Sequence, residues 1–170
     1  TGLFAGMLLG LVTVAAAVTA ADKADVPIPP ENTERGGRPS ADSANEGAAL
    51  LLQAIVADDP ASAEPFFFPL APFEVLKESW NPGRYHAKLL AWFREDVHAA
   101  HARFKSGEWT FDKIELGSCR WKPPGTEGNK IAYWSCRRNM VTARSGDKTR
   151  RFEIHTLINW GERWYVTHLG

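Results

Sequence analysis

Two histidines near the end of this sequence are the residues best placed for acid–base chemistry. If Gly161 and Glu162 form a two-residue hairpin turn, His155 on one strand lies opposite His168 on the next. Glu153 precedes His155 by two residues, and alternate residues of a strand share one face. The three side chains could form an acid–base group in a pocket or a partial set of metal ligands. The alternative is the polar outer face of a half-exposed sheet.

The remaining signals for catalysis or metal binding are weak. His98 and His101 are three residues apart on a predicted helix, close enough to bind one ion, but a durable zinc site needs a third ligand. The sequence has no serine elbow, phosphate-binding loop, dinucleotide fingerprint or zinc-protease helix. We therefore predict no metal and no cofactor, and we assign no catalytic residue.

The two cysteines, Cys119 and Cys136, are predicted to form a disulfide if the chain folds in an oxidising compartment. In a direct cross-strand pair they would centre the hairpin loop between Glu127 and Gly128, where turn residues are found. In the cytosol the same pair would more often be two buried thiols.

Four phenylalanines, Phe66, Phe67, Phe68 and Phe73, lie in a segment that three prolines interrupt. The prolines exclude a long regular element, whereas the aromatic rings require cover. One interpretation is an irregular segment packed across the open end of the core. The other is the apolar lip of a ligand pocket or a contact surface, because exposed apolar patches of that size usually bind something.

The chain begins with an uncharged apolar run, residues 2–21, which indicates export. We interpret residues 1–21 as either a cleaved signal peptide or a retained membrane anchor. Residues 22–43 are polar and rich in proline and glycine, and we predict a disordered linker there. The protein is therefore expected to be secreted, periplasmic or membrane-anchored. Its net charge of zero gives no indication of nucleic-acid binding.

Residues 44–170 are predicted to form a single α+β domain, with helices first and strands afterwards. Ser43 and Glu46 have the spacing of a capping box before a helix over 48–57, and apolar periodicity predicts a second helix over 84–105. Alternating patterns predict four strands in an antiparallel meander, over 109–121, 130–143, 148–160 and 163–169.

This order of elements, ending in a strand over 164–169, resembles the nuclear transport factor 2-like superfamily, which includes ketosteroid isomerases and polyketide cyclases. The resemblance implies helices folded over a cone-shaped sheet that holds a ligand. It rests on no motif, so it places no catalytic role on a named residue. Two hypotheses follow: a non-catalytic exported domain that binds a small apolar ligand or a protein, and an isomerase or cyclase that uses His155, His168 and Glu153.

Overall fold

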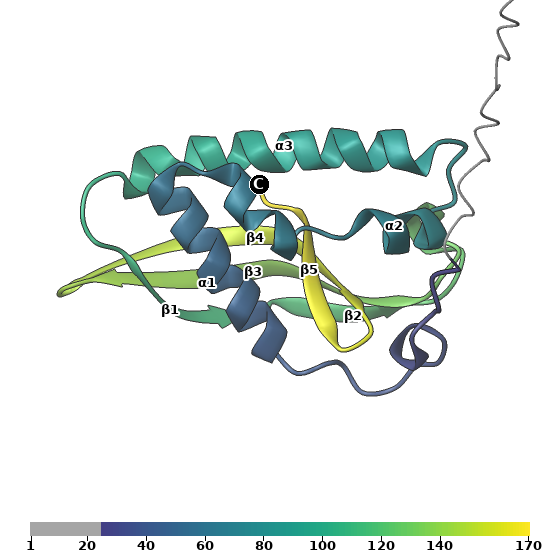
Figure 1. The fold of residues 1–170 in the computed structure, drawn as a ribbon. Helices are drawn as coiled ribbons and strands as arrows, with labels where there is room; N and C mark the ends of the chain where they lie inside the picture. Colours follow the sequence, from purple (N-terminus) through teal and green to yellow (C-terminus); the bar gives the residue numbers. More distant parts are fainter. Residues whose placement is uncertain (1–24) are drawn as a thin grey trace, which may run out of the picture.

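The computed structural model describes residues 25–170 and confirms the α+β class (Figure 1). Helices pack against one five-stranded sheet in which every pair of neighbouring strands is antiparallel. The helical elements are η1 (Pro30–Asn32), α1 (Asp42–Ala57), η2 (Pro60–Phe66), α2 (Leu70–Leu76), α3 (Pro82–Phe104) and η3 (Thr126–Gly128). The strands are β1 (Thr110–Glu115), β2 (Ser118–Lys122), β3 (Tyr133–Ser145), β4 (Lys148–Trp160) and β5 (Arg163–His168).

The sheet contains one more strand than the sequence predicts. The strand expected over 109–121 is two strands, β1 and β2, and both pair with β3. The order β1-β3-β4-β5 is otherwise the expected meander.

The break between β1 and β2 has a local cause at Gly117. A Cβ atom there would lie 2.1 Å from the carbonyl oxygen of Arg137, so only glycine allows the two backbones to approach this closely. Opposite it, Arg138 has a left-handed φ of 62°. The Asn139 side chain replaces the missing ladder contacts, since it accepts from Gly117 N at 3.1 Å and donates to the carbonyl oxygens of Cys136 and Ile154.

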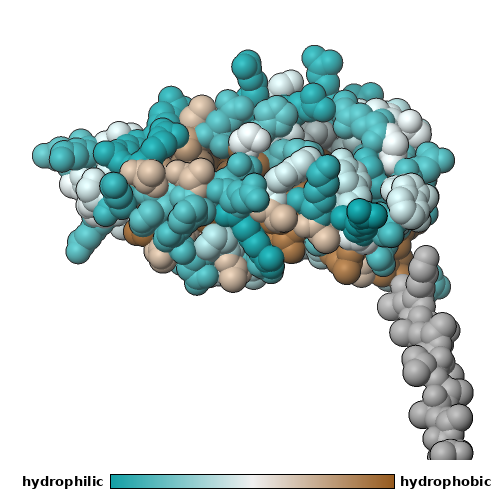
Figure 2. Space-filling view, turned by 90° about the horizontal axis from the view of Figure 1, so that it is seen from above, coloured by the Kyte–Doolittle hydropathy of each residue, from teal (hydrophilic) through white to brown (hydrophobic). Residues whose placement is uncertain are grey.

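Helix α1 begins earlier than predicted, and Ser43 is not its cap. The Oγ atom of Ser43 instead accepts a hydrogen bond from the Trp164 backbone N–H at 2.9 Å, which ties the helix to β5. Helix α3 matches its predicted range closely. Its N-cap Asn81 accepts from Arg84 N at 2.9 Å, and its buried stripe consists of His86, Leu89, Phe93, Val97 and Phe104. Figure 2, viewed from above α3, shows that the outer surface on this side is mostly hydrophilic.

The phenylalanine-rich segment is more regular than expected. It forms η2 and α2, and Phe67 between them bridges to Val166, which extends the sheet beyond β5. All four rings are buried, with Phe66, Phe67, Phe68 and Phe73 exposed by 4% or less. The four rings therefore belong to the core. A ring can have a role in ligand binding only if it also lines a cavity.

The described part of the predicted linker, residues 25–41, contacts the domain. The buried Asn32 side chain donates to the carbonyl oxygens of Ala132 and Asn159 and accepts from Gly161 N at 2.7 Å. Trp164 Nε1 donates to the Ser40 carbonyl oxygen at 2.9 Å. This part of the predicted disordered linker is therefore held against the domain, because one amide side chain bonds the residue before β3, a residue of β4 and the β4–β5 turn.

The apolar run at 2–21 lies outside the described residues. Within residues 25–170, no helix combines the length and the apolar character that crossing a membrane requires.

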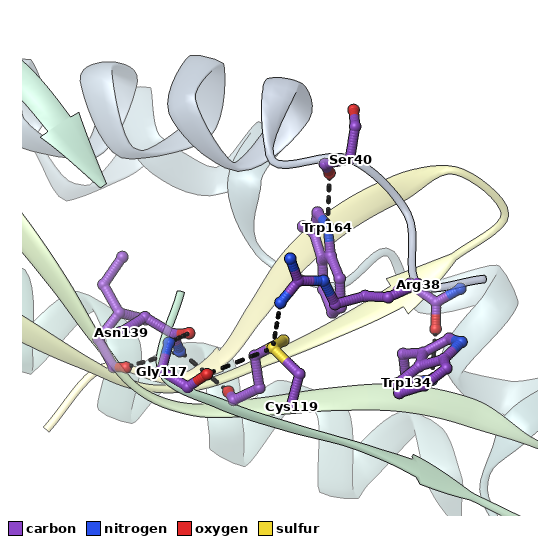
Figure 3. Close-up of a disulfide and its surroundings, with 10 residues drawn as sticks. Arg38, Ser40, Gly117, Cys119, Trp134, Asn139 and Trp164 are labelled. Carbon is purple, nitrogen blue, oxygen red and sulfur yellow. Dashed lines mark hydrogen bonds between the residues drawn. A yellow bond between two sulfur atoms is a disulfide. The ribbon is translucent and has the colours of Figure 1, made fainter. Parts of the chain in front are cut away.

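Cys119 and Cys136 form the predicted disulfide, between directly paired residues of β2 and β3. Figure 3 shows Arg38 reaching it from the N-terminal segment, and Arg38 Nη1 lies 3.3 Å from Cys119 Sγ. The bridge fixes the edge strand β2 to β3, beside the strands that carry the candidate site.

Candidate functional site

A cavity of about 260 Å³ lies between α2, the first half of α3 and the sheet. Four of its lining side chains are apolar and buried, and we call them the cavity floor: Phe73, Leu76, Leu89 and Ile158. The remaining lining residues are polar or amphipathic: Lys77, Tyr85, Glu127, Asn129, Tyr133, Ser135, Arg137, His155, Thr156, Thr167 and His168. The volume lies just below the range of typical small-molecule sites, about 300–1,000 Å³.

Strand register brings the polar lining residues into one row. Arg137 on β3 pairs with Thr156 on β4, and Thr156 pairs with His168 on β5. The neighbouring row contains Ser135 and Ile158. Directly paired residues place their side chains on the same face, so both rows point toward the cavity.

The loop around η3 closes one side of the cavity. Glu78 N donates to the Gly128 carbonyl oxygen at 2.8 Å, and Lys130 N donates to the Leu76 carbonyl oxygen at 2.9 Å. These backbone bonds hold the end of α2 against the loop between β2 and β3, so Lys77 and Glu127 meet at the rim.

A hydrogen-bonded network at this rim is centred on Glu127. Tyr133 Oη donates to Glu127 Oε2 at 2.9 Å and accepts from Asn129 Nδ2 at 2.8 Å. Lys122 Nζ and Arg137 Nη2 lie 2.8 Å and 3.0 Å from Glu127 Oε1. The hydrogen bond from Lys122 is the largest influence that lowers the pKa of Glu127, with help from Tyr133 and Arg137. Burial and the adjacent carboxylate raise the pKa of the Tyr133 phenol far above its usual value.

The two histidines meet at the cavity, but in a register shifted by one residue. His155 N donates to the Leu169 carbonyl oxygen, and His168 pairs with Thr156 rather than with His155. The register that the predicted hairpin turn sets is correct for the four residues of β4 from Trp160 back to Leu157. Beyond Leu157, an irregularity in β5 shifts the pairing by one residue. The two rings still lie close, with centroids 6.4 Å apart.

Burial is the main cause that lowers the pKa of His168. The charges of His155, Arg137 and Lys77 act in the same direction, and Asp96 opposes them. His168 is therefore held toward its neutral form, which can accept a proton or a hydrogen bond. Its Nδ1 lies 3.1 Å from the Thr167 hydroxyl, and His155 Nδ1 lies 2.8 Å from that of Thr156.

The other predicted site residues divide into two groups. Phe73 lines the cavity, whereas Phe66, Phe67 and Phe68 do not and are part of the core behind it. Glu153 lies outside as well, in a separate hollow beside α3 that it shares with His155. The structure therefore does not bring Glu153 together with both histidines in one cavity.

Lys77, Tyr133 and Arg137 line the cavity but are not among the site residues predicted from the sequence. The predicted pairing of Cys119 with Cys136 already fixes the positions of Arg137 and Tyr133 on β3, opposite Ser118 and Lys122. It was therefore a signal for where these two residues lie. Lys77 had no such signal, since its position depends on how the end of α2 meets the η3 loop.

A second hollow adjoins the cavity over β2 and β3, and it is strongly basic. Its lining residues are Ser118, Arg120, Lys122, Ser135, Arg137 and Arg138. Ser135 and Arg137 line both spaces, so the second hollow continues the first toward the sheet edge. We call it the basic shelf.

No group of three or more metal-ligating side chains occurs within residues 25–170. His98 instead contacts Asp58 Oδ1 at 2.7 Å, and the His101 Nδ1 atom contacts the Ile55 carbonyl oxygen at 2.9 Å. Both histidines thus connect α3 to the end of α1.

Comparison with known proteins gives no match. No protein-family model fits the chain, and no curated protein or solved structure is significantly similar to it.

Proposed function

We propose that this chain is an exported or membrane-tethered, non-catalytic domain that binds a small, largely apolar molecule in the cavity between α2, α3 and the sheet. The observation that carries the proposal is the cavity's lining: four buried apolar side chains from α2, α3 and β4, together with polar side chains from the sheet and the η3 loop. Apolar pockets with a few convergent polar groups are the usual form of small-molecule sites.

Two further features support this proposal. The disulfide is consistent with an oxidising, extracytoplasmic compartment. Helices over a curved antiparallel sheet are also the arrangement that the nuclear transport factor 2-like resemblance implies, and membership of that superfamily is part of the proposal.

A protein partner is less well supported than a small molecule. The four phenylalanines that could have formed a contact surface are buried. Within the described residues, the exposed large apolar side chains are Ile28, Leu70, Trp80 and Trp92, which come from four different segments of the chain.

The second candidate function is an isomerase or cyclase. The observation that favours it is the presence of His155 and His168 in the cavity, with His168 held toward the neutral form that could act as a base. The absence of Glu153 from the cavity weakens it, and Glu127 is a poor base because Lys122, Arg137 and Tyr133 stabilise its ionised form.

Methyl NMR tests the proposed binding directly. Decanol and decanoate serve as probes, and the methyl groups of Leu89 and Ile158 report on the cavity floor. We expect saturable shifts of these methyls with at least one probe. Ser135→Leu should reduce them, because Ser135 lines the cavity and its hydroxyl makes no hydrogen bond within the described residues.

Ser145→Leu is the matched control, since it makes the same change on the same strand, β3, but lies outside both the cavity and the basic shelf. Saturable binding that Ser135→Leu leaves intact would place the ligand elsewhere. The absence of shifts with both probes would contradict a ligand-binding cavity of this kind.

A further inference from the structure

Positive charge at the cavity exceeds the negative charge available to balance it. Lys77 and Arg137 both line the cavity. Among the described lining residues Glu127 carries the only carboxylate, and it is already engaged by Lys122, Arg137 and Tyr133.

Of the two cations among the described residues that line the cavity, Arg137 is paired with Glu127 and Lys77 is not. The Lys77 Nζ atom donates to the Glu127 carbonyl oxygen at 2.9 Å and lies 5.5 Å from the centre of the Tyr85 ring, but it makes no ion pair within residues 25–170. Burial lowers its pKa, and the more distant charge of Glu127 opposes that effect only in part. An ammonium in this position gains from an added anion more than a fully solvated one does.

The cations act on one region of the cavity. Both Arg137 and Lys77 lower the pKa of His168, although they belong to different elements, β3 and the end of α2. Asp96 opposes them at His168. Among the described residues that line the cavity, Lys77 and Arg137 therefore place two positive charges against the single carboxylate of Glu127.

The basic shelf extends this positive charge beyond the cavity. Arg120 and Arg138 line it together with Lys122 and Arg137, and no carboxylate is among its described lining residues. Arg120 and Arg138 make no ion pair in the part of the chain that the structure describes. Because the whole chain has zero net charge, this is a local concentration of cations rather than a general excess.

We propose that the ligand is an amphiphile with an anionic group, either a carboxylate or a phosphate monoester, held between Lys77 and Arg137. Its apolar body lies against Phe73, Leu76, Leu89 and Ile158, and a larger anionic group extends onto the basic shelf. This inference rests on the proposed function and specifies its ligand class. A neutral apolar ligand would cover the same floor but leave Lys77 without a counter-charge.

Four probes with the same ten-carbon chain test the charge requirement by calorimetry near neutral pH: decanoate, decyl phosphate, decanol and decyltrimethylammonium. We expect either anionic probe to bind at least about tenfold more tightly than decanol, which is the effect of one charge-assisted hydrogen bond. Decyltrimethylammonium should bind most weakly. If decyl phosphate binds more tightly than decanoate and Arg138→Gln removes that difference, the head group reaches the basic shelf. If both anions bind equally, the head group lies between Lys77 and Arg137.

Lys77→Met is the decisive variant, because methionine keeps the length of the side chain and removes the charge. It should lower the affinity for decanoate to that for decanol and leave decanol unchanged. Lys113→Met is the matched control, since Lys113 is half-exposed on β1, away from the cavity, and should leave all four affinities unchanged.

A measurement on the unaltered protein covers the case in which Lys77→Met does not fold. Bound decanoate should raise the pKa of His168 in an NMR titration, because the added negative charge offsets Lys77 and Arg137, whereas decanol should not. Equal affinities for decanol and decanoate would overturn the anionic inference and leave the proposed function standing. If none of the probes binds, both are wrong.

Discussion

His155 and His168 lie with their rings 6.4 Å apart although neither is the backbone partner of the other. His168 pairs with Thr156, and His155 N donates to Leu169. The irregularity in β5 therefore moves the backbone register by one residue while it keeps both imidazoles at the cavity. Two titratable groups this close, beside Arg137 and Lys77, make the cavity's charge depend on pH.

The first prediction concerns acid stability. The folded-state pKa of His168 lies below its unfolded value of about 6.5, so the unfolded chain binds this proton more readily. The free energy of unfolding is therefore unaffected by this group well above about pH 6.5, and it decreases as the pH falls through about 6.5. His168→Gln should therefore gain stability relative to the natural chain at about pH 5 but not at about pH 8. Urea unfolding at both pH values measures this, and equal differences at the two would contradict it.

The network around Glu127 should contribute to stability as well as shape the cavity. Tyr133→Phe removes the donor to Glu127 and leaves the amide of the buried Asn129 without its acceptor. We expect a loss of about 1–3 kcal/mol in the free energy of unfolding. Tyr165→Phe is the control, since the Tyr165 hydroxyl makes no hydrogen bond within the described residues. Equal effects of the two substitutions would show that the network contributes nothing specific.

The anchoring of the N-terminal segment depends on one residue. Asn32→Ala removes two buried hydrogen bonds, to the carbonyl oxygens of Ala132 and Asn159, and one part-buried bond from Gly161 N in the β4–β5 turn. The expected loss is at least about 1–3 kcal/mol, because the unpaired backbone groups remain buried. Thr33→Ala, which removes only an exposed local bond to Pro30, should have little effect. Chemical denaturation compares the two, and a silent Asn32→Ala would mean that the segment is not held in this way.

The disulfide should also stabilise the fold. Replacing both Cys119 and Cys136 with alanine removes a cross-link between residues 17 apart in sequence, worth roughly 3 kcal/mol on the chain-entropy model. The midpoint of thermal unfolding should fall clearly, and adding a reductant should lower it in the natural chain but not in the variant. Thiol labelling of both cysteines in the native, non-reduced protein would disprove the bond.

Much of the fold could be predicted from the sequence because periodicity and turn residues are local signals. The stripe from Leu89 to Phe104 indicated α3, and Gly161 with Glu162 indicated the last hairpin. The break at Gly117 could not be predicted, because it arises from the approach of Arg137 on another strand and from the Asn139 side chain. The anchoring of Asn32 was missed for the same reason, since its partners lie at least 100 residues away in sequence.

The candidate site, like the fold, could be predicted where local sequence signals place its residues and not where long-range contacts do. The histidines were identified because hairpin geometry places them near each other, and the one-residue error came from an irregularity that the sequence does not mark. Lys77 and Glu127 could not be paired, because their contact requires the end of α2 to meet the η3 loop. The cavity is thus formed by long-range packing between elements that are individually predictable.

Native mass spectrometry with added decanoate tests most directly whether the cavity binds a ligand. The natural chain, Ser135→Leu and Ser145→Leu are each incubated with the same excess of decanoate and compared under identical conditions. We expect one bound decanoate on the natural chain and on Ser145→Leu, and a strongly reduced bound fraction on Ser135→Leu. Equal occupancy of all three proteins, or no bound decanoate on the natural chain, would contradict a cavity that binds decanoate.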